Sequence, residues 1–271
     1  MFKIKLIDHL IKNGYFLDES TARTFIMSGQ VFANGERIMK PDEKISKKAY
    51  IEIMGQNVTY SSTDGYKLES ALSAFGISIL AKYAVDMFAM RGSISQSLLS
   101  GGASGVYTLY NDKRAINKAL LNIPTCKAVD ITNFDDNSLI ASFSSMFPPA
   151  QIAVLHSHSN SLKKYIPYFK YIMPAGDILW LIRPINEIDN PIIRKLGTMP
   201  KKAHLQVLKS ITDTINSYEG MAVNGLLPAK YIPNGAPCEF FIHIKLGDNI
   251  IPFNIDEDYI SDVVDSALSN K

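Results

Sequence analysis

The sequence has few cysteines and no long hydrophobic run. Among its 271 residues only Cys126 and Cys238 are cysteines, and neither has a Cys-x-x-Cys partner. This pattern favours neither a disulfide framework nor a thiolate metal site. No stretch reaches the roughly eighteen apolar residues of a membrane-spanning helix, and the N-terminus lacks the cleavage pattern of a signal peptide. The sequence therefore predicts a cytoplasmic protein without a membrane span.

The net charge is also small, at +2, so it does not by itself indicate a nucleic-acid-binding protein. The charges are unevenly distributed, however. Between positions 161 and 205 there are three acids and eight basic residues. The basic residues are Lys163, Lys164, Lys170, Arg183, Arg194, Lys195, Lys201 and Lys202. In residues 248–271 the balance reverses, with six acids against Lys271 alone. This distribution predicts one surface for an anionic partner and a solvated acidic tail over residues 248–271, although dispersed solvated charge would give the same pattern.

Residues 1–58 have the pattern of a small α+β domain. Apolar residues recur at helical spacing after Leu6, and a second helix is expected from Glu19 to Gly29. The dipeptide Asn34-Gly35 between two short apolar runs predicts a β-hairpin. A unit of this size buries little on its own, so we expect it to pack against a neighbour or a ligand.

Residues 59–65 are predicted to be a linker, and residues 66–247 to be a larger α/β domain. In this region expected strands alternate with expected helices. The strands are placed at 82–88, 105–110, 125–130, 152–156, 178–183 and 239–245, and the helices at 67–75, 93–100, 113–121 and 201–217. The alternation predicts a Rossmann-like domain, with a mostly parallel sheet, helices on both faces and a ligand at the carboxyl ends of the strands.

Several short motifs resemble one known family. Residues 22–41 are similar to the RNA-binding domain named after a small-subunit ribosomal protein. Residues 60–72 resemble the sequence Tyr-Val-Ser-Arg-Gly-Gly-x-Lys-Leu-x-x-Ala-Leu of the TlyA family, and weaker landmarks continue to about residue 245. The resemblance implies an FtsJ-like methyltransferase domain behind an RNA-binding domain. It also implies transfer of a methyl group from S-adenosylmethionine to ribose 2′-hydroxyls of ribosomal RNA, with ribosomal RNA or a ribosomal subunit as partner.

For the N-terminal domain, the resemblance implies that Lys5, Arg23, Arg37 and Lys40 face RNA phosphates. The usual Ser-Arg opening of the second helix is replaced by Asp18-Glu19. Acids suit a helix N-terminus, but they repel phosphate. A docking domain without an RNA role is therefore the alternative.

The family's cofactor loop reads Leu-Asp-Ile-Gly-x-x-x-Gly-Gly-Phe-x-Asp. Here Asp86 and Gly92 remain, but Phe88 replaces the first glycine, where its ring would occupy ligand space or distort the turn. Tyr110 stands in place of the acid that normally holds the cofactor ribose, and Asp130 is expected on the adenine side. S-adenosylmethionine is the cofactor that the resemblance implies.

The superfamily's catalytic Lys-Asp-Lys-Glu group corresponds to Lys67, His156, Arg183 and Glu239. In that group a lysine near the ribose hydroxyl assists its deprotonation. Arg183 cannot give up a proton at neutral pH, and His156 can act as a base but cannot supply a fixed negative charge. These changes predict weakened or lost catalysis, with a non-enzymatic RNA- or ribosome-binding pseudo-methyltransferase as the alternative.

Three further interpretations are less favoured. His156 and His158 would share one face of a strand, but no acidic or cysteine ligand lies nearby in the sequence, so no metal site is expected. Cys238 is expected to be a buried small residue rather than a nucleophile. Many TlyA-like proteins carry a haemolysin label, but direct membrane lysis needs an amphipathic or spanning segment, and the sequence indicates neither.

Overall fold

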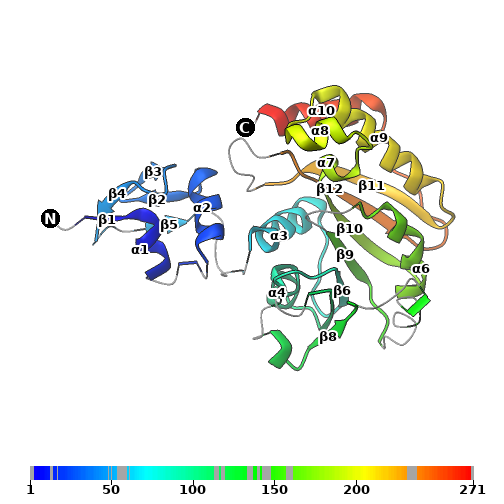
Figure 1. Cartoon of the computed structure of the whole chain (residues 1–271). Helices are drawn as coiled ribbons and strands as arrows, with labels where there is room; N and C mark the ends of the chain where they lie inside the picture. The colour runs from blue at the N-terminus through cyan, green and yellow to red at the C-terminus, as the bar shows by residue number, and fades with distance from the viewer. Residues whose placement is uncertain are drawn as a thin grey trace.

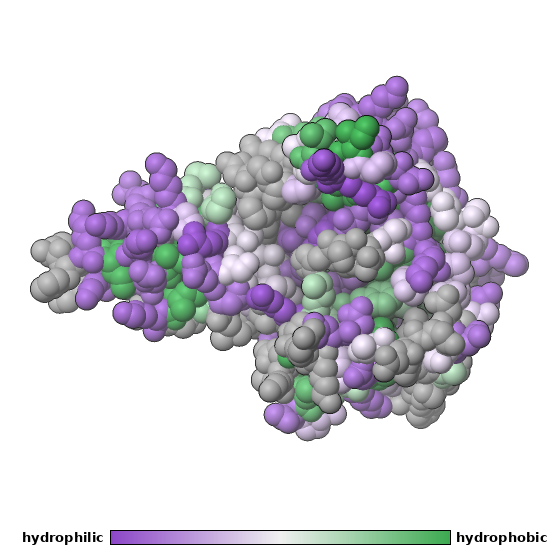
Figure 2. All heavy atoms as spheres, in the orientation of Figure 1, coloured by the Kyte–Doolittle hydropathy of each residue, from purple (hydrophilic) through white to green (hydrophobic). Residues whose placement is uncertain are grey.

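The computed structural model describes residues 3–12, 15–16, 18–47, 49, 51–53, 60, 62–112, 116, 120–132, 137–138, 141, 148–156, 161–230 and 237–269. Figure 1 shows a small N-terminal part beside a larger α/β part. Figure 2 shows a mixed surface, with apolar areas on the N-terminal part and an apolar patch over the helix that contains Ile192 and Leu196, which are 69% and 67% exposed.

The N-terminal part contains short elements only. They are β1 (Lys3–Lys5), α1 (Leu6–Lys12), α2 (Glu19–Met27), β2 (Val31–Ala33), β3 (Glu36–Ile38), β4 (Lys44–Ser46) and β5 (Ile51–Ile53). The strands form an antiparallel β1–β4 pair and a sheet in the order β3-β2-β5. Asn34 and Gly35 both have positive φ, 53° and 80°, as a two-residue hairpin turn requires, so the predicted hairpin is confirmed.

Asp18 begins α2 as its N-cap. Its carboxylate accepts hydrogen bonds from the backbone N–H and the hydroxyl of Thr21, at 2.9 and 2.8 Å. On the buried face of the helix, the ring of Phe25 packs edge-on against Tyr66 of the larger part, with 4.6 Å between ring centroids. Tyr60 and Tyr66 belong to the same apolar core as Leu6, Phe25 and Val31. The N-terminal core is therefore completed by its neighbour, as its small size predicts.

The larger part is built on one seven-stranded sheet. Its elements are α3 (Thr63–Phe75), β6 (Tyr83–Met87), α4 (Ser93–Ser100), β7 (Gly105–Tyr110), η1 (Leu120–Asn122), β8 (Cys126–Asp130), β9 (Ile152–His156), η2 (Lys163–Tyr168), α6 (Phe169–Ile172), β10 (Gly176–Ile182), α7 (Pro184–Glu187), α8 (Pro191–Leu196), α9 (Lys201–Asn216), β11 (Met221–Pro228), β12 (Phe240–Leu246) and α10 (Glu257–Ser269).

The strand order is β11-β12-β10-β9-β6-β7-β8. The five strands from β8 to β10 are parallel, and β12 runs antiparallel between β10 and β11. Both faces are covered: Trp180 belongs to a core shared with α9 and α10, whereas its neighbour Leu179 belongs to a core shared with α3 and α4. The predicted α/β fold with a mostly parallel sheet is therefore confirmed.

Two expectations about the elements were wrong. The acidic C-terminal residues are exposed, but they do not form a tail, because α10 packs Ile260, Val263 and Val264 into the core that it shares with α9. The predicted linker ends early, since α3 begins at Thr63. The helix expected over residues 113–121 lies mostly outside the described residues; within it the structure describes Ile116 and the start of the short η1 turn. Strand β11 was not predicted at all.

Among the described residues, no helix is long and apolar enough to cross a membrane.

Candidate active site and cofactor crevice

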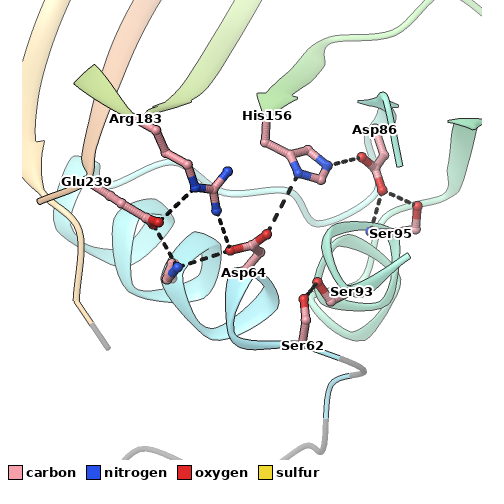
Figure 3. A network of polar contacts seen from close by, with 9 residues as sticks. Ser62, Asp64, Asp86, Ser93, Ser95, His156, Arg183 and Glu239 are labelled. Carbon is pink, nitrogen blue, oxygen red and sulfur yellow. Dashed lines mark hydrogen bonds and ion pairs between the residues drawn. The ribbon is translucent and has the colours of Figure 1, made fainter. Parts of the chain in front are cut away.

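Polar side chains gather where the carboxyl ends of β6, β9 and β10 meet the N-terminal end of α3 (Figure 3). β6 lies between β7, the next strand in the sequence, and β9, to which the chain returns after β8. The connections therefore diverge to the two sides of β6 at this edge. In open α/β sheets, ligands bind at such a switch point.

Four charged side chains form a closed ion quartet, which we define as Asp64, Lys67, Arg183 and Glu239. Asp64 and Lys67 are three residues apart on α3, and 3.1 Å separates their Oδ1 and Nζ atoms. Lys67 Nζ also donates to Glu239 Oε2 at 2.7 Å. Arg183 completes the ring, donating from Nε to Glu239 Oε1 at 2.8 Å and from Nη2 to Asp64 Oδ1 at 3.1 Å. The quartet balances two positive charges with two negative ones.

The quartet is almost completely buried, with side-chain exposures of 3–14%. Burial alone lowers the pKa of the Lys67 ammonium, but the carboxylates of Glu239 and Asp64 outweigh this effect and raise it above its ordinary value. In the same way, burial raises the pKa of Glu239, but Lys67 and Arg183 reverse the shift and hold it below its ordinary value. At neutral pH, Lys67 therefore keeps its proton and is a poor base.

His156, at the end of β9, forms a second chain of contacts beside the quartet. Its Nε2 lies 2.9 Å from Asp86 Oδ1 on β6. The other oxygen of Asp86 accepts from both the backbone N–H and the hydroxyl of Ser95, at 2.9 and 2.6 Å. His156 Nδ1 is buried and has no hydrogen-bond partner among the described residues, although Asp64 Oδ2 lies 3.9 Å away. These bonds orient the ring, with Nδ1 on the side of Asp64 (Figure 3).

The structure thus brings Lys67, His156, Arg183 and Glu239 to one edge of the sheet and adds Asp64, which the sequence reading missed. In the TlyA-like pattern, a glycine stands at the position of Asp64 and an aspartate at that of His156. The negative charge of the group is therefore carried by α3 rather than by the end of β9. One local signal was available, because Asp64 and Lys67 have the spacing of an ion pair on one helix face.

The loop that follows β6 retains a left-handed turn without its glycine. Phe88 has a φ of 63°, a conformation that is uncommon for a bulky residue. Its ring packs on Tyr165 of η2, with 4.6 Å between centroids. The next residue, Ala89, donates its N–H to the Leu109 carbonyl of β7 at 2.6 Å. The loop therefore keeps the left-handed turn, with Phe88 in a conformation that favours glycine, and it is bonded to the neighbouring strand.

The crevice between this loop and the end of β7 is filled by the protein's own side chains. Ala89, Tyr110 and Ile116 form a small buried apolar cluster there. The side chain of Leu120 lies directly over Gly92, where an added Cβ would come within 2.1 Å of it. Asp130 caps its own turn, accepting from the N–H and hydroxyl of Thr132. Apolar side chains therefore stand, among the described residues, where the resemblance implies the adenosine end of S-adenosylmethionine.

A polar cavity of about 250 Å³ lies beside His156, between the two parts of the chain. Ser20 and Thr24 of α2 line one side, and Ser62 and Ser93 line the other. Neither α3 nor α4 has a side-chain N-cap bond, so both helix starts contribute uncapped ends near the cavity. Arg91, also at the cavity, bridges the two parts through an ion pair with Asp18 at 3.4 Å.

The predicted RNA-binding residues all lie in the N-terminal part. Lys5 pairs with Asp42 at 2.9 Å, and Arg23 pairs with Glu19 at 2.6 Å. The Arg37 guanidinium lies over the ring of Phe32, 5.4 Å from its centroid, and Lys40 is exposed. Because two of the four already have acidic partners, any phosphate must compete with these carboxylates. Among the described residues, no group of three or more His, Cys, Asp or Glu side chains could hold a metal ion.

A parallel sheet with one antiparallel strand inserted next to its edge, and polar groups at the strand ends beside the switch point, defines the class of Rossmann-like methyltransferase folds. No family model matches the chain. Hemolysin A of Brachyspira hyodysenteriae is 30% identical over 191 residues, covering 65% of this chain and 78% of that protein. The chain belongs to this hemolysin A, or TlyA, family, as its motifs indicated.

Two further proteins are similar to almost the whole chain. "Putative rRNA methyltransferase YqxC" of Bacillus subtilis is 26% identical over 261 residues, covering 95% of this chain and 92% of that protein. The solved structure named "Putative hemolysin from Streptococcus thermophilus" has a TM-score of 0.68 at 24% identity, covering 99% of this chain and 96% of that one. The overall fold is therefore shared over the full length of the chain.

Proposed function

We propose that this chain is an RNA-binding homologue of ribosomal RNA methyltransferases, in which methyl transfer from S-adenosylmethionine to a ribose 2′-hydroxyl is weakened or lost. The cofactor crevice carries the proposal: Ala89, Tyr110 and Ile116 fill the space beside β7 where this fold class holds a cofactor. Phe88 and Tyr110 replace the glycine and the acid on which cofactor binding depends in the TlyA-like pattern.

The state of the lysine supports the same proposal. A lysine that assists deprotonation of a hydroxyl must be able to release its own proton near neutral pH. Glu239 and Asp64 raise the pKa of Lys67 in spite of its burial, and Arg183 is a permanent cation. The quartet therefore orders the strand ends but provides no base among its four members.

The RNA partner is inferred from the family and from the N-terminal part. One relative is named as an rRNA methyltransferase, and it is similar along nearly its entire length. The N-terminal part has the helices and hairpin of the predicted RNA-binding domain, with Arg37 and Lys40 beside the hairpin. Ribosomal RNA is the partner that follows, bound mainly through phosphate contacts.

The test is calorimetric titration of the full chain with S-adenosylmethionine, beside Phe88→Gly and a control, Phe253→Gly. Phe253 is 48% exposed and packs on Tyr259, outside the crevice. We expect no binding by the wild type or the control. Binding by Phe88→Gly alone would show that replacement of the glycine after β6 excludes the cofactor, and micromolar binding by the wild type would contradict the proposal.

An active methyltransferase is the second candidate, and one observation favours it. In the tautomer in which His156 Nε2 donates its hydrogen bond to Asp86, Nδ1 is the proton acceptor beside the cavity. His156 would then be the base in place of Lys67. In that case His156→Gln abolishes methylation of ribosomal RNA by a wild type that binds the cofactor.

A further inference from the structure

A segment rich in lysine and tyrosine follows the site strand β9. Residues 163–171 read Lys-Lys-Tyr-Ile-Pro-Tyr-Phe-Lys-Tyr, and no acidic residue occurs between Ser161 and Gly176. The apolar members anchor the segment, since Ile166 and Phe169 are at most 1% exposed. Lys164, Lys170 and Tyr171 are exposed, and Tyr165 and Tyr168 are half-buried. The buried apolar side chains therefore fix the segment so that its lysine and tyrosine side chains face solvent.

The rings and ammonium groups on this segment are arranged in pairs. Lys164 Nζ lies 4.7 Å from the ring centroid of Tyr165, and Lys170 Nζ lies 5.2 Å from that of Tyr171. Tyr165 lies between Tyr168 and Phe88, with centroid distances of 6.3 and 4.6 Å. A row of aromatic rings therefore runs from the former cofactor loop onto the lysine-rich segment.

The start of the segment is tied to the site edge. Glu187 of α7 accepts hydrogen bonds from the hydroxyl of Ser161 and from the backbone N–H of Leu162 at 3.1 Å. Since Phe88 contacts Tyr165, the first rings of the segment lie next to the loop that follows β6. A ligand on the segment is thus placed beside the carboxyl ends of the strands.

We propose that Lys163–Tyr171 is a binding surface for single-stranded RNA, which stacks its bases on the tyrosines and places its phosphates at Lys164 and Lys170. The inference rests on the proposed RNA-binding function and extends it to a second surface, outside the N-terminal part. Alternating rings and cations match a chain that alternates bases and phosphates, whereas an acidic peptide needs only the cations. Bases in a duplex are already stacked and cannot use the rings.

The test is fluorescence anisotropy with a labelled single-stranded RNA of about 20 nucleotides and the full chain, at several salt concentrations. We expect the double variant Lys164→Gln/Lys170→Gln to bind RNA about tenfold more weakly. The salt slope, which is the dependence of log affinity on log salt concentration, should fall in magnitude by about 1.4 because two phosphate contacts are lost. Tyr171, which is 45% exposed, supplies the ring test. Tyr171→Ala weakens binding about fivefold without changing the salt slope, and Tyr171→Phe retains it.

Lys127→Gln is the matched control. Lys127, on β8, is exposed. Its Nζ lies 5.9 Å from the ring centroid of Tyr83 and 5.1 Å from that of Tyr107. It therefore has the same chemistry outside the proposed surface, and we expect wild-type affinity. If the double variant and Tyr171→Ala bind RNA as tightly as this control, the proposed binding surface at Lys163–Tyr171 is wrong. RNA binding by the N-terminal part would not be affected by that result.

Two other results would also overturn the inference. Equal losses for duplex and single-stranded RNA would show that the lysines contact phosphates only and that the rings do not stack bases. Absence of any RNA binding by the wild type would remove the proposed function together with this surface.

Discussion

Two regions at the same edge of one sheet have diverged in opposite ways. On the side of β10 and β12, the quartet keeps its charges in balance, with Asp64 on α3 taking over the negative charge. On the side of β7, the crevice has exchanged polar and glycine positions for Phe88 and Tyr110, and an apolar cluster fills it. The physical costs explain the difference. A buried charge without a partner destabilises the whole fold, whereas a ligand crevice can close on apolar side chains.

The largest expected effect is on the quartet. Glu239→Gln leaves Lys67 and Arg183 with only Asp64, and we expect the free energy of unfolding to fall by about 3–5 kcal/mol. Chemical denaturation measures it. The control Lys201→Gln breaks an exposed pair with Asp265, and it should cost less than about 1 kcal/mol. Equal losses for the two variants would show that burial adds nothing to the quartet.

The same comparison can be sharpened with pH. The pKa of Glu239 is lowered in the fold, so its contribution is complete above its ordinary value of 4.5 and is lost as the pH falls through the folded value. The pKa of Lys67 is raised, so its contribution is complete below 10.5 and is lost only as the pH rises through the folded value. The difference in unfolding free energy between wild type and Glu239→Gln should therefore be constant near neutral pH and shrink in acid below 4.5. A difference that grows in acid would contradict the quartet assignment.

The smallest effect is expected in the crevice. Phe88→Gly and Phe88→Ala both lose the contact with Tyr165, but only glycine relieves the positive φ of 63°. We expect the glycine variant to be more stable than the alanine variant by about 1 kcal/mol in thermal or urea unfolding. At Phe75, the last residue of α3, we expect the opposite order of stability. Phe75→Ala should be more stable than Phe75→Gly, because alanine suits a helix better than glycine. The same order at both positions would show that the turn after β6 is not strained.

Prediction from the sequence succeeded where the signal is local. The Asn34-Gly35 turn, the Asp18 cap position and the alternating strands each depend on neighbouring residues, and the mostly parallel sheet follows from the order of strands and helices. The site residues were placed by resemblance, and the structure brings the four catalytic positions together. It does not test their roles.

Prediction from the sequence failed where a residue's environment depends on contacts with distant segments of the chain. Asp64 was assigned to a linker, and its contacts with Arg183 and His156 come from segments more than ninety residues away. The ring of Phe88 packs on Tyr165, which lies 77 positions further along the chain, although the turn itself has a positive φ. The C-terminal acids were taken as a solvated tail, although the apolar face of α10, with Ile260 and Val264, needed a surface to cover.

The sequence by itself determined most of the elements of this protein, the mostly parallel character of its sheet and the family to which it belongs, because these depend on apolar periodicity, turn residues and the spacing of motifs. Only the tertiary structure decided how the charges are paired and whether the crevice is open. Lys67 and Glu239, which lie 172 positions apart, meet at 2.7 Å. Such a contact depends on the packing of all the elements between them, and therefore the charge balance of the site exists only in the folded chain.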